Sequence, residues 1–106
     1  MTDKKIVLTT AGSHEEAGKI ARALVERRLA ACVNVVAIES VYRWKQTVES
    51  AEEWLLVIKT TAAAFDDIHA AIKQLHSYEL PECVMLPIES GSQEYLEWIG
   101  ESVDVE

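Results

Sequence analysis

The predicted strands of this 106-residue chain are apolar on both faces, and this feature restricts how the chain can fold. In residues 32–44, CVNVVAIESVYRW, both alternating rows consist largely of valine, isoleucine and aromatic side chains, and residues 54–61, WLLVIKTT, begin in the same way. An antiparallel sheet covered by helices on one side needs only one apolar face. A second apolar face left in water would be larger than monomers usually tolerate. The sequence therefore predicts that another copy of the chain covers that face.

The order of the elements follows from hydrophobic periodicity. Runs rich in β-branched residues predict strands at residues 6–10, 32–44, 54–61 and 83–88. Apolar residues spaced three and four apart predict a helix after Ser13, a helix over about 62–75 and a short helix from Ser92. The resulting β-α-β-β-α-β order is the ferredoxin-like arrangement, so we expect an α+β fold with a C-terminal helix in a single domain over residues 1–106.

Two local signals refine this order. Ser13 and Glu16 have the spacing of a capping box, in which each side chain bonds the free backbone N–H of the other residue at the start of the first helix. Residues 45–53, KQTVESAEE, are polar and join the two long strands. We expect this segment to form the tip of a hairpin that extends beyond the sheet.

The net charge of −8 is concentrated in the last third of the chain. Residues 1–73 hold ten basic and ten acidic side chains, whereas residues 74–106 hold eight acids and neither Lys nor Arg. No basic cluster is larger than Arg27-Arg28, which argues against nucleic-acid binding, because that function needs a cationic surface. The apolar run near the N-terminus is too short for a signal peptide, and none approaches the roughly 18 residues of a membrane span. We expect a cytoplasmic protein without a membrane partner.

The segment HSYELPEC, residues 76–83, contains the most concentrated chemistry. Copper accepts imidazole, thiolate and carboxylate ligands, so His76, Glu82 and Cys83 are candidate metal ligands. The segment also joins a helix to a strand, where His76 could cap the helix end, Tyr78 could pack with its hydroxyl bonded and Cys83 could point into the protein. Three interpretations stay open: a structural join, a metal site within one chain, and a site shared between subunits.

No catalytic motif is present. The sequence lacks GxSxG, HExxH, GxGxxG and P-loop patterns, and it contains only four glycines. Its paired acids are adjacent in sequence and so cannot converge on one bond as acid and base. We expect a protein that is not an enzyme.

Several stretches resemble the CutA family of divalent-cation tolerance proteins. These are EEAGKIARALVERRLAACVNVV, SVYRW, EEWLLVIKTT and HSYELPECVMLPIESGSQEYLEWI, which together span nearly the whole chain in order. The resemblance implies a ferredoxin-like subunit in a tight homotrimer, with the long hairpin reaching a neighbour. The family usually has glycine where Gln46 stands, so the hairpin tip is expected to turn differently.

The resemblance also implies a function: divalent-cation tolerance, or a response to metal ions, with weak binding of copper or another divalent cation that folding does not require. The ligands proposed in bacterial copper-binding members are a cysteine at the end of the first strand and two adjacent histidines after the second helix. By motif these positions fall on Thr9, Leu75 and His76, so only His76 keeps the ligand type.

A second functional class follows from the same resemblance. The architecture is similar to PII signalling proteins, trimers that bind effectors in clefts between subunits. Residues resembling the family's polar cleft are Asn34, Trp44, Lys59, His76, Tyr78 and Glu82. An aromatic wall with a lysine and a carboxylate would suit a small anionic or zwitterionic ligand. A rigid trimeric scaffold for a protein partner is the third alternative.

Overall fold

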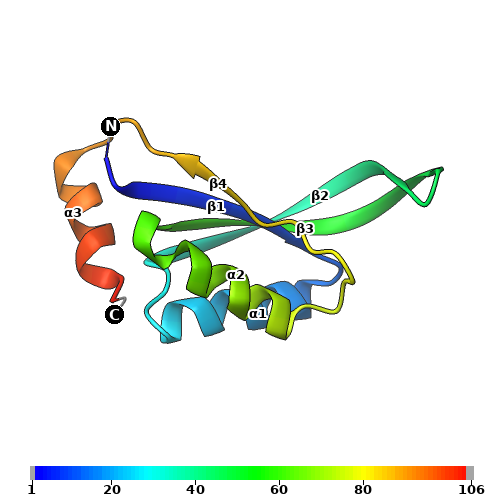
Figure 1. The fold of residues 1–106 in the computed structure, drawn as a ribbon, viewed down its shortest axis with the longest axis horizontal. Helices are drawn as coiled ribbons and strands as arrows, with labels where there is room; N and C mark the ends of the chain where they lie inside the picture. Colours follow the sequence, from blue (N-terminus) through cyan, green and yellow to red (C-terminus); the bar gives the residue numbers. More distant parts are fainter. Residues whose placement is uncertain (1, 105–106) are drawn as a thin grey trace.

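The computed structural model describes residues 2–104, so residue 1 and residues 105–106 of the predicted domain lie outside the described residues. Its four antiparallel strands form one sheet in the order β2-β3-β1-β4, flanked by three α-helices (Figure 1). The elements are β1 (Lys4–Ala11), α1 (His14–Glu26), β2 (Cys32–Trp44), β3 (Thr47–Thr61), a 3-10 turn (Ala62–Ala64), α2 (Phe65–Leu75), β4 (Val84–Pro87) and α3 (Gln93–Ser102). The predicted α+β class and the β-α-β-β-α-β order with a C-terminal helix are confirmed.

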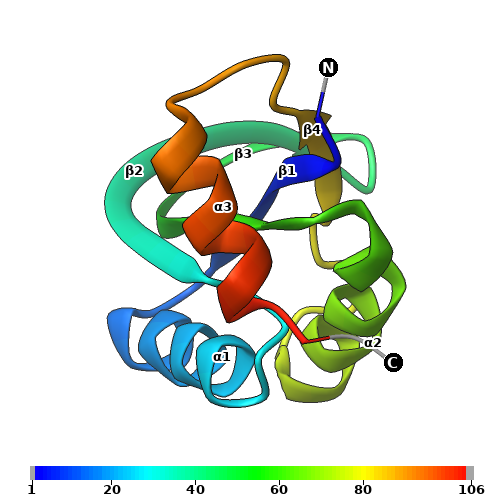
Figure 2. The same cartoon turned by 90° about the vertical axis from the view of Figure 1, so that its left-hand side faces the viewer.

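The helices α1 and α2 lie side by side against one face of the sheet (Figures 1 and 2). Successive side chains of a strand point to opposite faces, and the pairing places alternate residues of β1 and β3 in the same layer. On the helix-covered side this layer is fully buried and includes Val7, Thr9, Leu56 and Ile58. It forms the core together with the apolar stripes of the two helices, including Ile20 and Ile68.

The opposite face of the sheet, called here the open face, keeps the apolar side chains that its sequence predicted. On this face Val36 is 46% exposed, and on the edge strand β4 the side chains of Val84 and Leu86 are 46% and 45% exposed. The helix α3 lies at one end of the sheet, where it buries Ile99 (Figure 2). The remaining open face is an exposed apolar surface bounded by an exposed edge strand.

The hairpin of β2 and β3 extends well beyond the rest of the sheet (Figure 1), but its predicted tip was too long. Residues 47–53 are not loop; they belong to β3 and pair with β2 up to the Trp44–Thr47 pair. The prediction was wrong because a two-stranded ribbon in water has no core to bury, so its strands need not be apolar.

Only Lys45 and Gln46 form the turn, with φ angles of 50° and 71°. Positive φ at both central residues is the pattern of a type I′ turn, which matches the twist of the flanking strands. Gln46 therefore adopts a backbone conformation that glycine would accept at lower cost.

Candidate functional site

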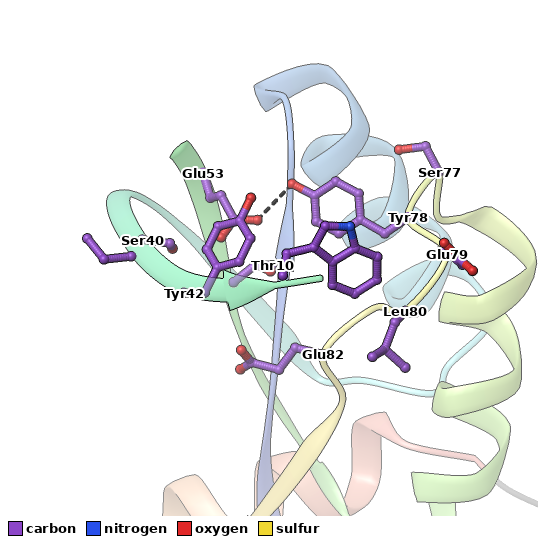
Figure 3. A pocket seen from close by; sticks show the side chains of 11 residues that line it. Thr10, Ser40, Tyr42, Glu53, Ser77, Tyr78, Glu79, Leu80 and Glu82 are labelled. Carbon is purple, nitrogen blue, oxygen red and sulfur yellow. Dashed lines mark hydrogen bonds between the residues drawn. The ribbon is translucent and has the colours of Figure 1, made fainter. Parts of the chain in front are cut away.

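A pocket of about 720 Å³ lies between the β2–β3 hairpin and the loop that joins α2 to β4 (Figure 3). Its walls come from the end of β1, from both hairpin strands and from residues 77–82. The lining residues are Thr10, Ser40, Val41, Tyr42, Trp44, Glu53, Ser77, Tyr78, Glu79, Leu80 and Glu82. The volume falls in the range of small-molecule sites in proteins, roughly 300–1,000 Å³.

A tyrosine–carboxylate pair forms the inner wall of the pocket. The Tyr78 hydroxyl donates a hydrogen bond of 2.7 Å to Oε2 of Glu53, whose side chain lies beside Tyr42 (Figure 3). Glu53 is only 7% exposed. Partial burial, and then the nearby Glu53 carboxylate, raise the pKa of Tyr78 well above its usual value, so the phenol stays protonated and donates.

The close approach of Tyr78 depends on a glycine. A Cβ atom on Gly12 would lie 3.0 Å from the Tyr78 hydroxyl oxygen and 3.3 Å from its ring. The residue after β1 thus leaves room for the ring that bonds Glu53.

His76 fixes the loop that carries Tyr78. Its side chain is fully buried, and Nε2 donates a hydrogen bond of 2.5 Å to the carbonyl oxygen of Thr10, which can only accept. Nδ1 accepts a hydrogen bond of 3.0 Å from the backbone N–H of Tyr78 and lies 3.1 Å from Oε1 of Glu16. Both ring nitrogens are therefore engaged in holding residues 76–78 against the end of β1.

Glu16 links the start of α1 to the same loop. The Ser13 hydroxyl accepts a hydrogen bond of 3.1 Å from the Glu16 N–H, as half of the predicted capping box requires. The Glu16 carboxylate instead accepts bonds from the N–H of Ser77, at 3.0 Å, and from its hydroxyl, at 2.8 Å. Partial burial alone would raise the pKa of Glu16, but these bonds outweigh it and the pKa is lowered.

Cys83 lies after the pocket loop and packs against the hydrophobic core, as one of the open interpretations expected. Burial, and then the negative charge of Glu82, raise the pKa of the Cys83 thiol. This favours the protonated form, which is a poorer metal ligand than a thiolate.

The three candidate metal ligands do not converge within the chain. Across residues 2–104, no group of three or more His, Cys, Asp or Glu side chains is arranged to hold a metal ion. Leu75, one of the positions mapped from the family's proposed ligands, packs partly buried against the core, and Thr9, the other, is fully buried. A site shared between subunits, with His76, Glu82 or Cys83 as ligands, stays a prediction.

The predicted polar cleft separates into two places. Trp44, Tyr78 and Glu82 line the pocket, whereas the Lys59 ammonium bonds the Asn34 side chain elsewhere on the sheet. Lys59 lies six residues from Glu53 along β3, or about 20 Å at the rise of a strand. Within one chain the lysine therefore lies away from the aromatic wall, and a cleft between subunits that includes both stays a prediction.

Sequence reasoning missed Glu53 and Tyr42 as pocket residues. The sequence places Glu53 in a polar segment that resembles a loop, and Tyr42 in one of the largely apolar rows of residues 32–44. Only the strand register, which pairs Ile38 with Glu53, and the return of the loop after α2 bring them together with Tyr78.

Among the described residues, no helix has the length and apolar character needed to cross a membrane.

Comparison with known proteins gives consistent matches over nearly the whole chain. A family model described as "CutA1 divalent ion tolerance protein" matches residues 5–102. The Thermus thermophilus protein named "Divalent-cation tolerance protein CutA" is 49% identical over 100 residues, which cover 93% of this chain and 97% of that protein.

Solved structures agree with the sequence matches. The structure described as the periplasmic divalent cation tolerance protein CutA from Archaeoglobus fulgidus has a TM-score of 0.93 and 40% identity, and the match covers 95% of this chain and 99% of that one. CutA1 from Oryza sativa has a TM-score of 0.94 and 38% identity, covering 97% of this chain and 95% of that one. The similarity thus covers the fold of nearly the whole chain.

Proposed function

Because this chain belongs to the CutA1 divalent ion tolerance family, we propose that it acts in divalent-cation tolerance as a homotrimer that is not an enzyme, binding copper or another divalent ion weakly between subunits. The single observation that carries the assembly is the exposed apolar open face. Val36, Val84 and Leu86 there are each about half exposed, and β4 presents unpaired backbone groups at the sheet edge. Burying them against further copies would remove an unfavourable surface from water.

The state of the candidate ligands in one chain favours a metal site between subunits over a site within a single chain. Both nitrogens of His76 are engaged in hydrogen bonds, and the Cys83 thiol favours its protonated form. Glu82 is exposed and lines the pocket, so its carboxylate is accessible to a neighbouring chain. A weak site completed by a second copy agrees with these facts better than a strong site within one chain.

The assembly and the metal can be tested with one pair of variants. Val36→Glu puts a charge on the open face, whereas Val25→Glu puts the same charge on α1, where the native valine is similarly exposed, at 41% compared with 46%. In sedimentation velocity the wild type and Val25→Glu should have the mass of three 11.8 kDa chains, and Val36→Glu should be a monomer. In copper titration, Val36→Glu should lose the binding that Val25→Glu keeps. A monomeric wild type would contradict the trimer, and equal copper binding by a monomeric variant would place the metal within one chain.

The cellular role needs a separate experiment. A strain that lacks its own member of the family would be complemented with this chain and grown over a series of copper concentrations. Restored growth by the wild type and Val25→Glu, without rescue by Val36→Glu, would support tolerance that depends on assembly. Growth that is the same with and without the protein would contradict the proposed function.

Binding of a small molecule, as in a sensor, is a second candidate, and the pocket is the observation that favours it. Its volume, its aromatic lining and its place beside the open face are those of a ligand site. A ligand and a metal ion are distinguishable, because a pocket ligand should change the signal of Trp44 in protein that is free of copper.

A further inference from the structure

We propose that the pocket binds a small organic cation, such as an amine or a methylated ammonium ion; this inference rests on the second candidate function, the binding of a small molecule. Three carboxylates line the pocket, those of Glu53, Glu79 and Glu82. Among residues 2–104, no Lys, Arg or His side chain lines it. The anionic or zwitterionic ligand expected from sequence depended on Lys59 in a cleft between subunits, and within one chain Lys59 lies outside the pocket. The charge of the lining therefore selects a positive ligand.

Aromatic rings are the second feature of the pocket that favours a positively charged ligand. Tyr42, Trp44 and Tyr78 all line the pocket, and a cation within about 6 Å of such a ring is attracted by its π electrons. The structure contains one example of this attraction at the pocket edge, since the Lys45 ammonium lies 5.7 Å from the centre of a Trp44 ring. The aromatic wall can therefore accept positive charge.

Glu53 offers one carboxylate oxygen to a ligand in the pocket. The residue is more than nine-tenths buried, and its Oε2 accepts the hydrogen bond from the Tyr78 hydroxyl. Oε1 accepts no hydrogen bond from residues 2–104, but it is not sealed from solvent, because Oγ1 of Thr9 is the one fully buried and unpartnered side-chain oxygen or nitrogen among these residues. An ammonium group in the pocket would donate to Oε1 and supply the opposite charge.

A bare metal ion fits this pocket less well than an organic cation. Metal ions need several donors that converge at about 2.0–2.6 Å. The carboxylates of the pocket form no such group within the described residues. An ammonium ion with carbon substituents needs only loose ion pairing and apolar contact, which Leu80 and the aromatic rings provide.

The distribution of charge would help the ligand to arrive. Residues 74–106 contain eight acids and no Lys or Arg, and the loop that forms one wall of the pocket belongs to this acidic third. Negative potential around a cleft raises the local concentration of cations. Binding should therefore weaken as the salt concentration rises.

The test is a titration of the full chain with choline, followed by heteronuclear NMR at the indole N–H of Trp44, which is assigned from a Trp44→Phe variant. The matched control ligand is the neutral alcohol in which carbon replaces the nitrogen of choline. Choline should shift the Trp44 signal and bind about tenfold more tightly than the neutral alcohol. Glu82→Gln should weaken choline binding by roughly twofold to fivefold. Glu39→Gln, which removes an exposed carboxylate of β2 outside the pocket, should leave it unchanged.

The outcomes separate the ligand class from the proposed function. Equal affinity for choline and its neutral analogue would overturn the proposal that the ligand is an organic cation. The same would follow if Glu82→Gln bound choline as tightly as the wild type does. Shifts caused by acetate but not by choline would also overturn it while leaving a small-molecule site intact. If none of the three compounds shifts the Trp44 signal, both the cation and the small-molecule function are contradicted.

Discussion

Replacing Thr9 with valine should stabilise the protein. Thr9 lies in β1 on the helix-covered side of the sheet and is fully buried. Its Oγ1 is buried without a hydrogen-bond partner among the described residues. Valine has nearly the same shape, keeps the strand preference of threonine and brings no polar atom into the core. Thr9→Val therefore removes a desolvated hydroxyl and leaves the packing in place.

The magnitude follows from the cost of a buried unpaired hydroxyl, about 1–3 kcal/mol in mutational data. We expect Thr9→Val to raise the free energy of unfolding by about 1–2 kcal/mol, the lower part of that range. Thr60 provides a matched control, because it is also fully buried but its hydroxyl donates a hydrogen bond of 2.6 Å to the carbonyl oxygen of Leu29. Thr60→Val should lower the free energy of unfolding by about 1–3 kcal/mol, since that carbonyl loses its donor. The same chemical change thus has opposite signs at two buried positions.

Guanidinium unfolding curves of the three proteins measure these differences. All samples need the same protein concentration, because association shifts apparent stability by mass action. The midpoint should move up for Thr9→Val and down for Thr60→Val while the slope stays constant, which indicates a change in stability and not in the unfolded state. A midpoint for Thr9→Val that falls as it does for Thr60→Val would mean that Oγ1 of Thr9 has a partner, and would refute the reasoning.

Three further substitutions and one control test the loop, the turn and an ionised side chain. Gly12→Ala should destabilise the protein by about 1–2 kcal/mol, because the added Cβ displaces Tyr78 from its carboxylate partner. The control Gly18→Ala should stabilise it by about 0.5–1 kcal/mol, because a Cβ at this position of α1 meets open space. Thermal unfolding measures both changes. Gln46→Gly should stabilise by about 1 kcal/mol in denaturant unfolding, since φ is 71° there, and an unchanged or lower midpoint would contradict the type I′ turn. The pKa of Glu16 is lowered in the folded state, so its contribution to stability is present above about pH 4.3 and is lost as the pH falls through the folded-state pKa. Glu16→Ala should therefore be less stable than the wild type at neutral pH. A difference in stability that persists at low pH would contradict this.

Much of the fold could be predicted because burial imposes periodicity. The stripe of α1 that includes Ile20 and Leu24 recurs at helical spacing, and both residues are fully buried. Residues 47–52 could not be predicted in the same way, because this part of β3 pairs with β2 outside the hydrophobic core and is largely exposed. The hairpin is therefore correct in position and β2 has its predicted bounds, but β3 begins at Thr47 and not at Trp54 as predicted.

The site was less predictable because its contacts join distant parts of the chain. His76 bonds the carbonyl of Thr10, which is 66 residues away, and Tyr78 bonds Glu53, which is 25 residues away. The sequence identifies the residue types in HSYELPEC but not the geometry that occupies both nitrogens of His76. The prediction that Tyr78 packs with its hydroxyl bonded is confirmed. Its partner could not be named, since Glu53 is one of several acids in a segment that resembles a solvated loop.

One row of β2 connects the proposed assembly with the proposed ligand site. Val36, Tyr42 and Trp44 are separated by even numbers of residues, so they share the row of side chains on the open face. Val36 and Tyr42 are six residues apart, or about 20 Å along the strand. If the proposed trimer contact extends this far along the row, the pocket would lie at its rim. Ligand binding and assembly would then be coupled, because each would stabilise the strand conformation that the other needs.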